Sequence, residues 1–109
     1  MKTLNQGENI ILQTDEVAWK PSTFANGLSV KDIAIAGGFE MQFVRMEACA
    51  KIPAHIHKLP EFIYILEGEL IVADKVLTKG CVSIAAPGSQ HLDVHTVHGC
   101  TFLLVDEPV

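Results

Sequence analysis

The stretch His55-Ile56-His57-Lys58-Leu59-Pro60-Glu61 contains two histidines and a glutamate whose spacing decides the predicted fold and site. Side chains alternate between the two faces of an extended strand, so His55 and His57 are expected on one face. The proline interrupts that strand, and Glu61 opens an apolar run over residues 62–66 that predicts the next one. A carboxylate at the start of this run can return beside the two imidazoles.

A further histidine, His91, comes directly after the turn sequence Pro87-Gly88-Ser89-Gln90. Three imidazoles and one carboxylate suit a divalent transition metal such as Fe, Zn, Mn or Ni better than Mg or Ca, because those ions accept nitrogen donors. A histidine beside apolar residues is more often packed or solvated, and only the combined spacing favours a metal. The sequence therefore predicts one metal ion bound by four side chains: His55, His57, Glu61 and His91.

Two spaced motifs resemble those of the cupin superfamily. The first is His55-x-His57-x3-Glu61-x6-Gly68, and the second is Gly80-x5-Ala86-Pro87-Gly88-x2-His91. The resemblance covers about residues 40–105. It departs from the usual pattern at Cys49, where the first motif opens with glycine, at Ala86, which replaces a proline, and at His95, where the second motif often ends in asparagine. None of these changes removes a ligand, and the resemblance implies a cupin barrel that forms a homodimer.

Three shorter segments narrow the resemblance: Trp19-Lys20-Pro21, Gly27-Leu28-Ser29-Val30-Lys31 and Gly99-Cys100. They are similar to a subgroup that contains the cupin domain of ChrR-type anti-sigma factors and the acetylacetone-cleaving dioxygenases. This subgroup often carries a second glutamate after the ligand glutamate, where this chain has Phe62. The resemblance implies either oxygen-dependent cleavage of a small diketone-like molecule or a sensing role in regulation.

Predicted strands follow one another at short intervals, separated by turn residues. Residues 28–35 and 39–46 flank Gly37-Gly38, which favours a hairpin. Residues 67–69 are expected to form a turn, and the other predicted strands cover residues 9–12, 62–66, 70–73, 76–80, 82–85 and 101–105. Short antiparallel strands are typical of sandwiches and barrels, so the sequence predicts an all-β fold, a small antiparallel jelly-roll barrel.

The chain is expected to form a single cupin domain over residues 1–109, with residues 1–25 as an N-terminal edge strand or arm. His91, Asp93 and His95 are expected on one face of a single strand, where Asp93 could orient His91. His95 could act there as a second-shell catalytic base, with a solvated histidine as the alternative. Residues 106–108 are expected to end the domain in solvent.

Composition excludes several classes of partner. A net charge of −5 offers no general attraction to nucleic acid or to an anionic membrane. The apolar runs are too short for a membrane-spanning helix, and residues 1–8 lack the apolar core of an export signal. Three cysteines without C-x-x-C spacing favour free thiols, mainly as small buried side chains, in a reducing cytoplasm.

Three functions are compatible with these residues. The first is a metal-dependent, dioxygenase-like enzyme that acts on a small organic molecule such as a diketone. The second is a non-catalytic module that senses a metal or ligand, and the third is a barrel whose site is vestigial. The presence of all four ligand residues counts against the third, but metal shells are shared between enzymes and sensors, so the first two stay open.

Overall fold

The computed structural model describes residues 1–91 and 93–108, without the side chain of His91. One 3-10 turn, η1, spans Thr14–Glu16. The strands are β1 (Lys2–Thr3), β2 (Lys20–Pro21), β3 (Leu28–Ala36), β4 (Phe39–Met46), β5 (Lys51–Ile52), β6 (His55–Ile56), β7 (Glu61–Val72), β8 (Lys75–Thr78), β9 (Val82–Ala85), β10 (Gln90–His91), β11 (Val94–His95) and β12 (Cys100–Asp106). The predicted all-β class is confirmed.

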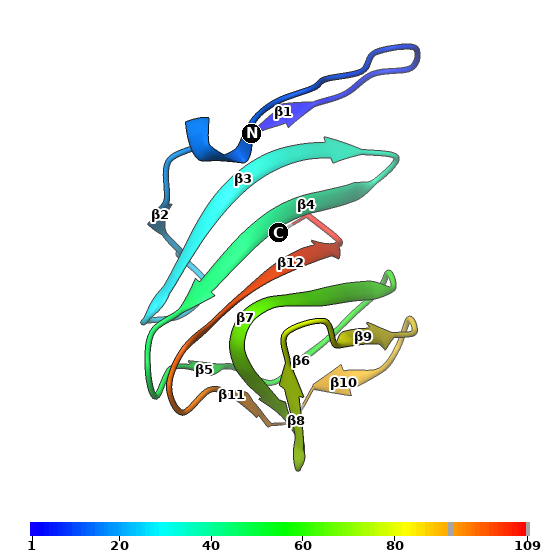
Figure 1. Ribbon diagram of the computed structural model, residues 1–109. Helices are drawn as coiled ribbons and strands as arrows, with labels where there is room; N and C mark the ends of the chain where they lie inside the picture. The colour runs from blue at the N-terminus through cyan, green and yellow to red at the C-terminus, as the bar shows by residue number, and fades with distance from the viewer. Residues whose placement is uncertain (92, 109) are drawn as a thin grey trace.

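The strands form one large curled sheet and one small pair (Figure 1). The large sheet has the order β1-β3-β4-β12-β7-β11-β5, and β10 pairs with β6 outside it. Strands β3 and β4 form the predicted hairpin, and β12 lies between β4 and β7 in antiparallel register. In the part of the chain that the structure describes, no helix has the length and apolar character needed to span a bilayer.

Strand β7 is the longest element, and it bends through most of its length (Figure 1). Its first residues pair with β9 and β12, whereas residues 69–72 pair with β8. The predicted turn at residues 67–69 is therefore wrong. Gly68 instead adopts a positive φ of 75° inside the strand, a conformation open to glycine, and lets the strand curl around the core.

The core lies on the concave side of the curled sheet. Along β7, Ile63 and Ile65 are buried while Phe62, Tyr64 and Leu66 are exposed on the outer face. This alternation is the period of two that an extended strand imposes. The inward residues form one cluster with those of the neighbouring strands, which includes Leu28, Val30, Val44, Met46, Leu70, Val94 and Phe102.

Two other predicted strands differ from the structure. Residues 9–12 form no strand, and the edge of β3 is paired with Lys2 and Thr3 of β1 instead. The single strand expected around residues 91–95 is instead two short strands with different partners. β10 pairs with β6, whereas β11 pairs with β5 and β7.

Candidate metal centre and its cavity

Three of the four predicted ligands converge. His55 lies on β6, His57 follows that strand directly, and Glu61 is the first residue of β7. One possible ligand atom from each lies within 4.8 Å of the other two. His57 is 3% exposed and Glu61 is 5% exposed, so these two are held inside the protein, whereas His55 is partly exposed.

The contacts around the two imidazoles orient their nitrogens. His55 Nδ1 lies 2.7 Å from the carbonyl oxygen of Pro53, which can only accept a hydrogen bond, so Nδ1 donates and Nε2 carries the lone pair. His57 Nε2 lies 2.9 Å from Glu61 Oε2. The two rings are nearly perpendicular, with their centroids 4.4 Å apart. Such partners fix the ring orientation that a metal ligand needs.

The donor set fits a divalent transition metal. Nitrogen and oxygen ligands bind such an ion at about 2.1 Å, so donor atoms sharing one ion lie at most about 4.2 Å apart. The donor atoms of the metal-free protein are spaced by up to 4.8 Å, so the three side chains would move closer together as they bind an ion. Two imidazoles with a carboxylate also match the ligand preference of Fe, Zn, Mn and Ni.

The remaining candidates take different positions. The backbone of His91 lies directly opposite His55 where β10 pairs with β6, and its side chain lies outside the described part of the chain. His95 is on β11, and it is not among the residues that line the cavity below. Its Nδ1 lies 3.2 Å from Asp93 Oδ1, so the described partner of Asp93 is His95. A catalytic role for His95 stays a prediction.

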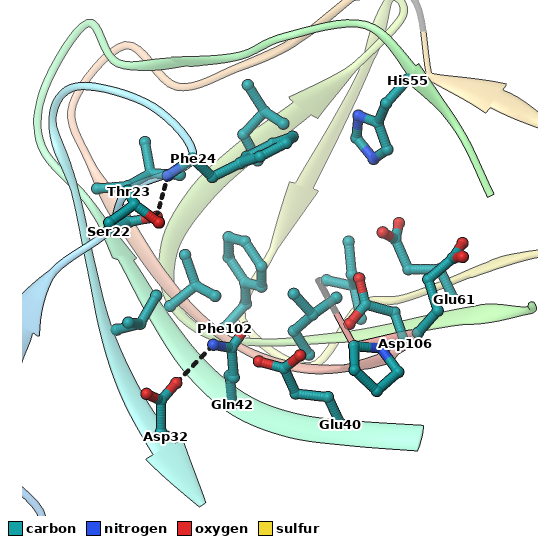
Figure 2. Close-up of a pocket in the computed structure, with 18 of the residues that line it drawn as sticks. Ser22, Thr23, Phe24, Asp32, Glu40, Gln42, His55, Glu61, Phe102 and Asp106 are labelled. Atoms are coloured by element: carbon teal, nitrogen blue, oxygen red, sulfur yellow. Dashed lines mark hydrogen bonds between the residues drawn. The ribbon is translucent and has the colours of Figure 1, made fainter. Parts of the chain in front are cut away.

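A cavity of about 590 Å³ opens beside the cluster and is bounded by the concave face of the sheet (Figure 2). Its walls are mostly apolar: they include Phe24, Leu28, Val30, Val44, Ile52, Ile63, Val94, Phe102 and Leu104. His55, His57 and Glu61 all line it. A metal bound by these three residues would therefore face the cavity.

Carboxylates that the sequence analysis missed gather at the metal end of this cavity. Glu40 lies opposite Asp106 in the pairing of β4 with β12, and both line the cavity with Glu61. Figure 2 shows Glu61 and Asp106 on the side of the cavity where His55 lies, and Glu40 next to Asp106 but farther from His55. The expectation that residues 106–108 end in solvent holds for Pro108, which is exposed, and is wrong for Asp106. Asp106 shares its strand face with Phe102 and Leu104, and the period of two along β12 was the signal for it.

The crowding of carboxylates changes their ionisation. Burial raises the pKa of Glu61 to about 7, with a further contribution from Glu107. Burial also raises the pKa of Asp106 to about 7, and the negative charges of Glu61, Glu40 and Glu107 add to the effect. In the metal-free protein these groups therefore hold protons at a pH where exposed carboxyl groups have lost them.

This crowding predicts an unusual pH dependence of stability. The folded-state pKa of Asp106 lies above its unfolded value, so the folded state binds more protons between the two values, and its stabilising contribution is lost as pH rises through about 7. Metal-free protein with a chelator present should therefore melt at a lower temperature at about pH 8 than at about pH 5. Asp106→Asn should flatten this decline, whereas the control Asp15→Asn, on the exposed turn η1, should retain it. An unchanged slope in Asp106→Asn would contradict the assignment.

The sequence of residues 7–109 matches the family described as ChrR cupin-like domain. The chain belongs to this family. No curated protein sequence gives a significant match.

Solved structures share the fold of this cupin. A candidate acetylacetone dioxygenase from Methylibium petroleiphilum matches with a TM-score of 0.84 and 16% identity, over 95% of this chain and 80% of that one. An acetylacetone dioxygenase from Acinetobacter johnsonii matches with a TM-score of 0.76 and 12% identity, over 95% and 76%. The anti-sigma ChrR in complex with SigE, from Rhodobacter sphaeroides, gives a TM-score of 0.72 and 19% identity, over 87% and 51%. Identities this low show a common fold only.

One departure from the usual first cupin motif has a structural explanation. Cys49, at the position where the first motif usually opens with glycine, has a φ of 67°. That left-handed conformation favours glycine, so Cys49 occupies a backbone position suited to the residue that usually opens the motif. Cys49 is exposed and only Cys100 is fully buried, so the expectation of three buried cysteines holds for one of them.

Proposed function

We propose that this cupin binds one divalent transition metal and is a dioxygenase-like enzyme that acts on a small organic molecule. The observation that carries the proposal is the cluster of His55, His57 and Glu61, the last two of them buried, at the wall of a largely apolar cavity. The metal would be Fe, Zn, Mn or Ni, bound by this cluster and by His91. Support for His91 comes from its backbone position opposite His55.

The metal, the apolar walls and the ligand residues would each have a different role. When bound, a metal with open coordination positions would act as a Lewis acid toward the substrate. The apolar walls, with Phe24 and Phe102 among them, would exclude bulk water and hold the body of the substrate. His55 and His57 would stay neutral and Glu61 ionised, because only these forms bind a metal. Metal binding would therefore release the proton of Glu61 and weaken in acid.

The cavity favours a small uncharged substrate such as a β-diketone. Its volume of about 590 Å³ is within the range of small-molecule sites, about 300–1,000 Å³. Glu40 and Asp106 line the cavity with Glu61, so above about pH 7, where Asp106 is ionised, a ligand that carries its own carboxylate would be repelled. The largest part of the lining that a substrate would contact is apolar, with polar side chains such as Ser22, Thr23 and Gln42 between the apolar ones.

Oxygen uptake by the Fe(II)-loaded protein tests this proposal. Pentane-2,4-dione should support uptake, whereas pentanoate, which is similar in size and carries a charge, should not. The Glu61→Gln variant, with the same iron added, should lose the activity. Binding of the diketone without oxygen uptake would reject the enzyme and leave the sensor.

The alternative is a non-catalytic cupin that senses a metal or ligand in regulation. The structural match to the anti-sigma ChrR favours it, although this chain spans about half the length of that protein. A sensor would bind metal and a small molecule without turnover, and it would pass the change to a partner. A protein that binds neither metal nor ligand would indicate the third possibility, a vestigial site.

We also propose that two copies of this cupin associate through the outer face of β7 and β9. Phe62 lies opposite Ile84 and Tyr64 opposite Val82, and all four side chains are exposed. An apolar group of this kind can meet its own copy across a two-fold axis. Sedimentation at low concentration should show a dimer, and a monomer would reject it.

The three free cysteines also favour the reducing cytoplasm, which cell fractionation would test.

A further inference from the structure

A carboxylate beyond the last strand links two parts of the candidate site. Glu107 directly follows β12 and is partly exposed. Its Oε1 accepts a hydrogen bond of 2.6 Å from the backbone N–H of Lys58. The same oxygen lies 3.6 Å from His57 Nδ1. Glu107 therefore contacts both a candidate ligand and the loop that leads from that ligand to Glu61.

We propose that Glu107 is a positioning residue for the metal site, which holds the Nδ1–H of His57 so that Nε2 faces Glu61 and the metal. This inference rests on the metal-binding part of the proposed function. It assigns no ligand role to Glu107 itself. Outer carboxylates commonly hold a ligating imidazole in this way, fixing its tautomer and raising its basicity.

The two ring nitrogens of His57 point in the directions that this role requires. Nε2 lies 2.9 Å from Glu61 Oε2, so Nε2 is the nitrogen on the side of the cluster. Nδ1 lies on the side of Glu107. The gap of 3.6 Å is longer than a hydrogen bond, and it would shorten as a bound metal makes the Nδ1–H more acidic.

The hydrogen bonds from the loop keep Glu107 in the form that the role needs. The backbone N–H groups of Lys58 and Leu59 hold the pKa of Glu107 below its usual range, and His57 adds to the effect. An ionised carboxylate is therefore available to His57. The hydrogen bond from the Lys58 N–H also ties Glu107 to the short loop between His57 and Glu61.

A second glutamate, which holds a loop away from the cavity, provides a comparison that distinguishes positioning of His57 from simple capping of a loop. Glu69 Oε1 accepts hydrogen bonds from the backbone N–H groups of Val97, at 3.2 Å, and His98, at 2.9 Å. Glu69 is thus a carboxylate that holds a loop, but it does not line the cavity. Glu69→Gln is therefore the matched control for Glu107→Gln.

The experiment measures Zn(II) affinity by competition with a chromophoric chelator, together with melting of the metal-free protein. Glu107→Gln should weaken Zn(II) binding about 10- to 100-fold, while its melting temperature falls no more than that of Glu69→Gln. Glu107→Asp, which keeps the charge on a shorter arm, should recover part of the affinity. Wild-type affinity in Glu107→Gln, or an equal loss in both glutamine variants, would overturn the proposal.

A metal-free measurement separates this inference from the proposed function. Proton–nitrogen correlation spectra of the imidazoles should show His57 with its proton on Nδ1 in the wild type, and a shift of that signal in Glu107→Gln but not in Glu69→Gln. If the wild type binds no metal, the proposed function fails, yet this readout still tests the contact. An unchanged His57 signal in Glu107→Gln would reject the positioning role.

Discussion

Gly68→Ala is expected to leave little folded protein. Gly68 has a φ of 75°, and a Cβ built there would overlap the carbonyl oxygen of Gly99 and lie 2.7 Å from the Cα of Cys100. These obstacles are backbone atoms at the start of β12, which no side-chain rotation can remove. The left-handed conformation alone costs about 1–2 kcal/mol, and separating β7 from β12 would add several more. Domains of this kind are stable by only about 5–15 kcal/mol.

Gly80→Ala provides the control for this substitution. Gly80 has a φ of 91°, but a Cβ there would meet no atom within 4 Å. It therefore carries the backbone strain without the overlap. Soluble yield and urea unfolding should show Gly80→Ala mildly destabilised and Gly68→Ala severely so. Equal losses in the two variants would show that β7 and β12 can separate at little cost.

Loss of His57 should abolish useful metal binding. Removing an outer partner of a metal ligand costs about 10- to 100-fold in affinity, so removing a ligand should cost more than about 100-fold. His57→Ala also leaves a buried gap beside Glu61, so His55→Ala, at a less buried position, serves as the second variant. Both should lower Zn(II) affinity in a chelator competition assay, with circular dichroism to confirm the fold.

His95→Ala is the matched histidine control for that experiment. His95 contacts Asp93 and does not line the cavity, so its removal should leave Zn(II) affinity at the wild-type value. A loss of affinity in His95→Ala that equals the loss in His57→Ala would mean that the metal is bound elsewhere.

The sequence predicts those features that depend on local pattern. The hairpin of β3 and β4 follows from alternation around Gly37-Gly38, and β9 and β12 follow from short apolar runs with turn residues on either side. The convergence of His55, His57 and Glu61 follows from a spacing that is short enough for local geometry to decide. In each of these cases the signal lies in the residues of the segment itself and in the turn residues beside it.

Features that depend on distant partners were missed. Glu67-Gly68-Glu69 has the composition of a turn, and only the approach of Gly99 shows that Gly68 bends a continuous strand. Residues 106 and 107 read as a solvated tail because they are acidic and precede a proline. The register of β12 against β4 and the contact of Glu107 with the loop after His57 bring them to the metal end of the cavity. Register between strands far apart in the chain is not encoded in either segment alone.

The alternation along β7 has a consequence for how metal affinity should be measured. Glu61 points inward and its neighbour Phe62 points outward, so one peptide unit separates a candidate ligand from the exposed apolar surface. A molecule that binds to that surface and shifts the backbone of Phe62 would also shift Glu61, because the two residues are adjacent in the chain. A dissociation constant for the metal that drifts with dilution of the protein would reveal that the two faces of this strand are thermodynamically linked.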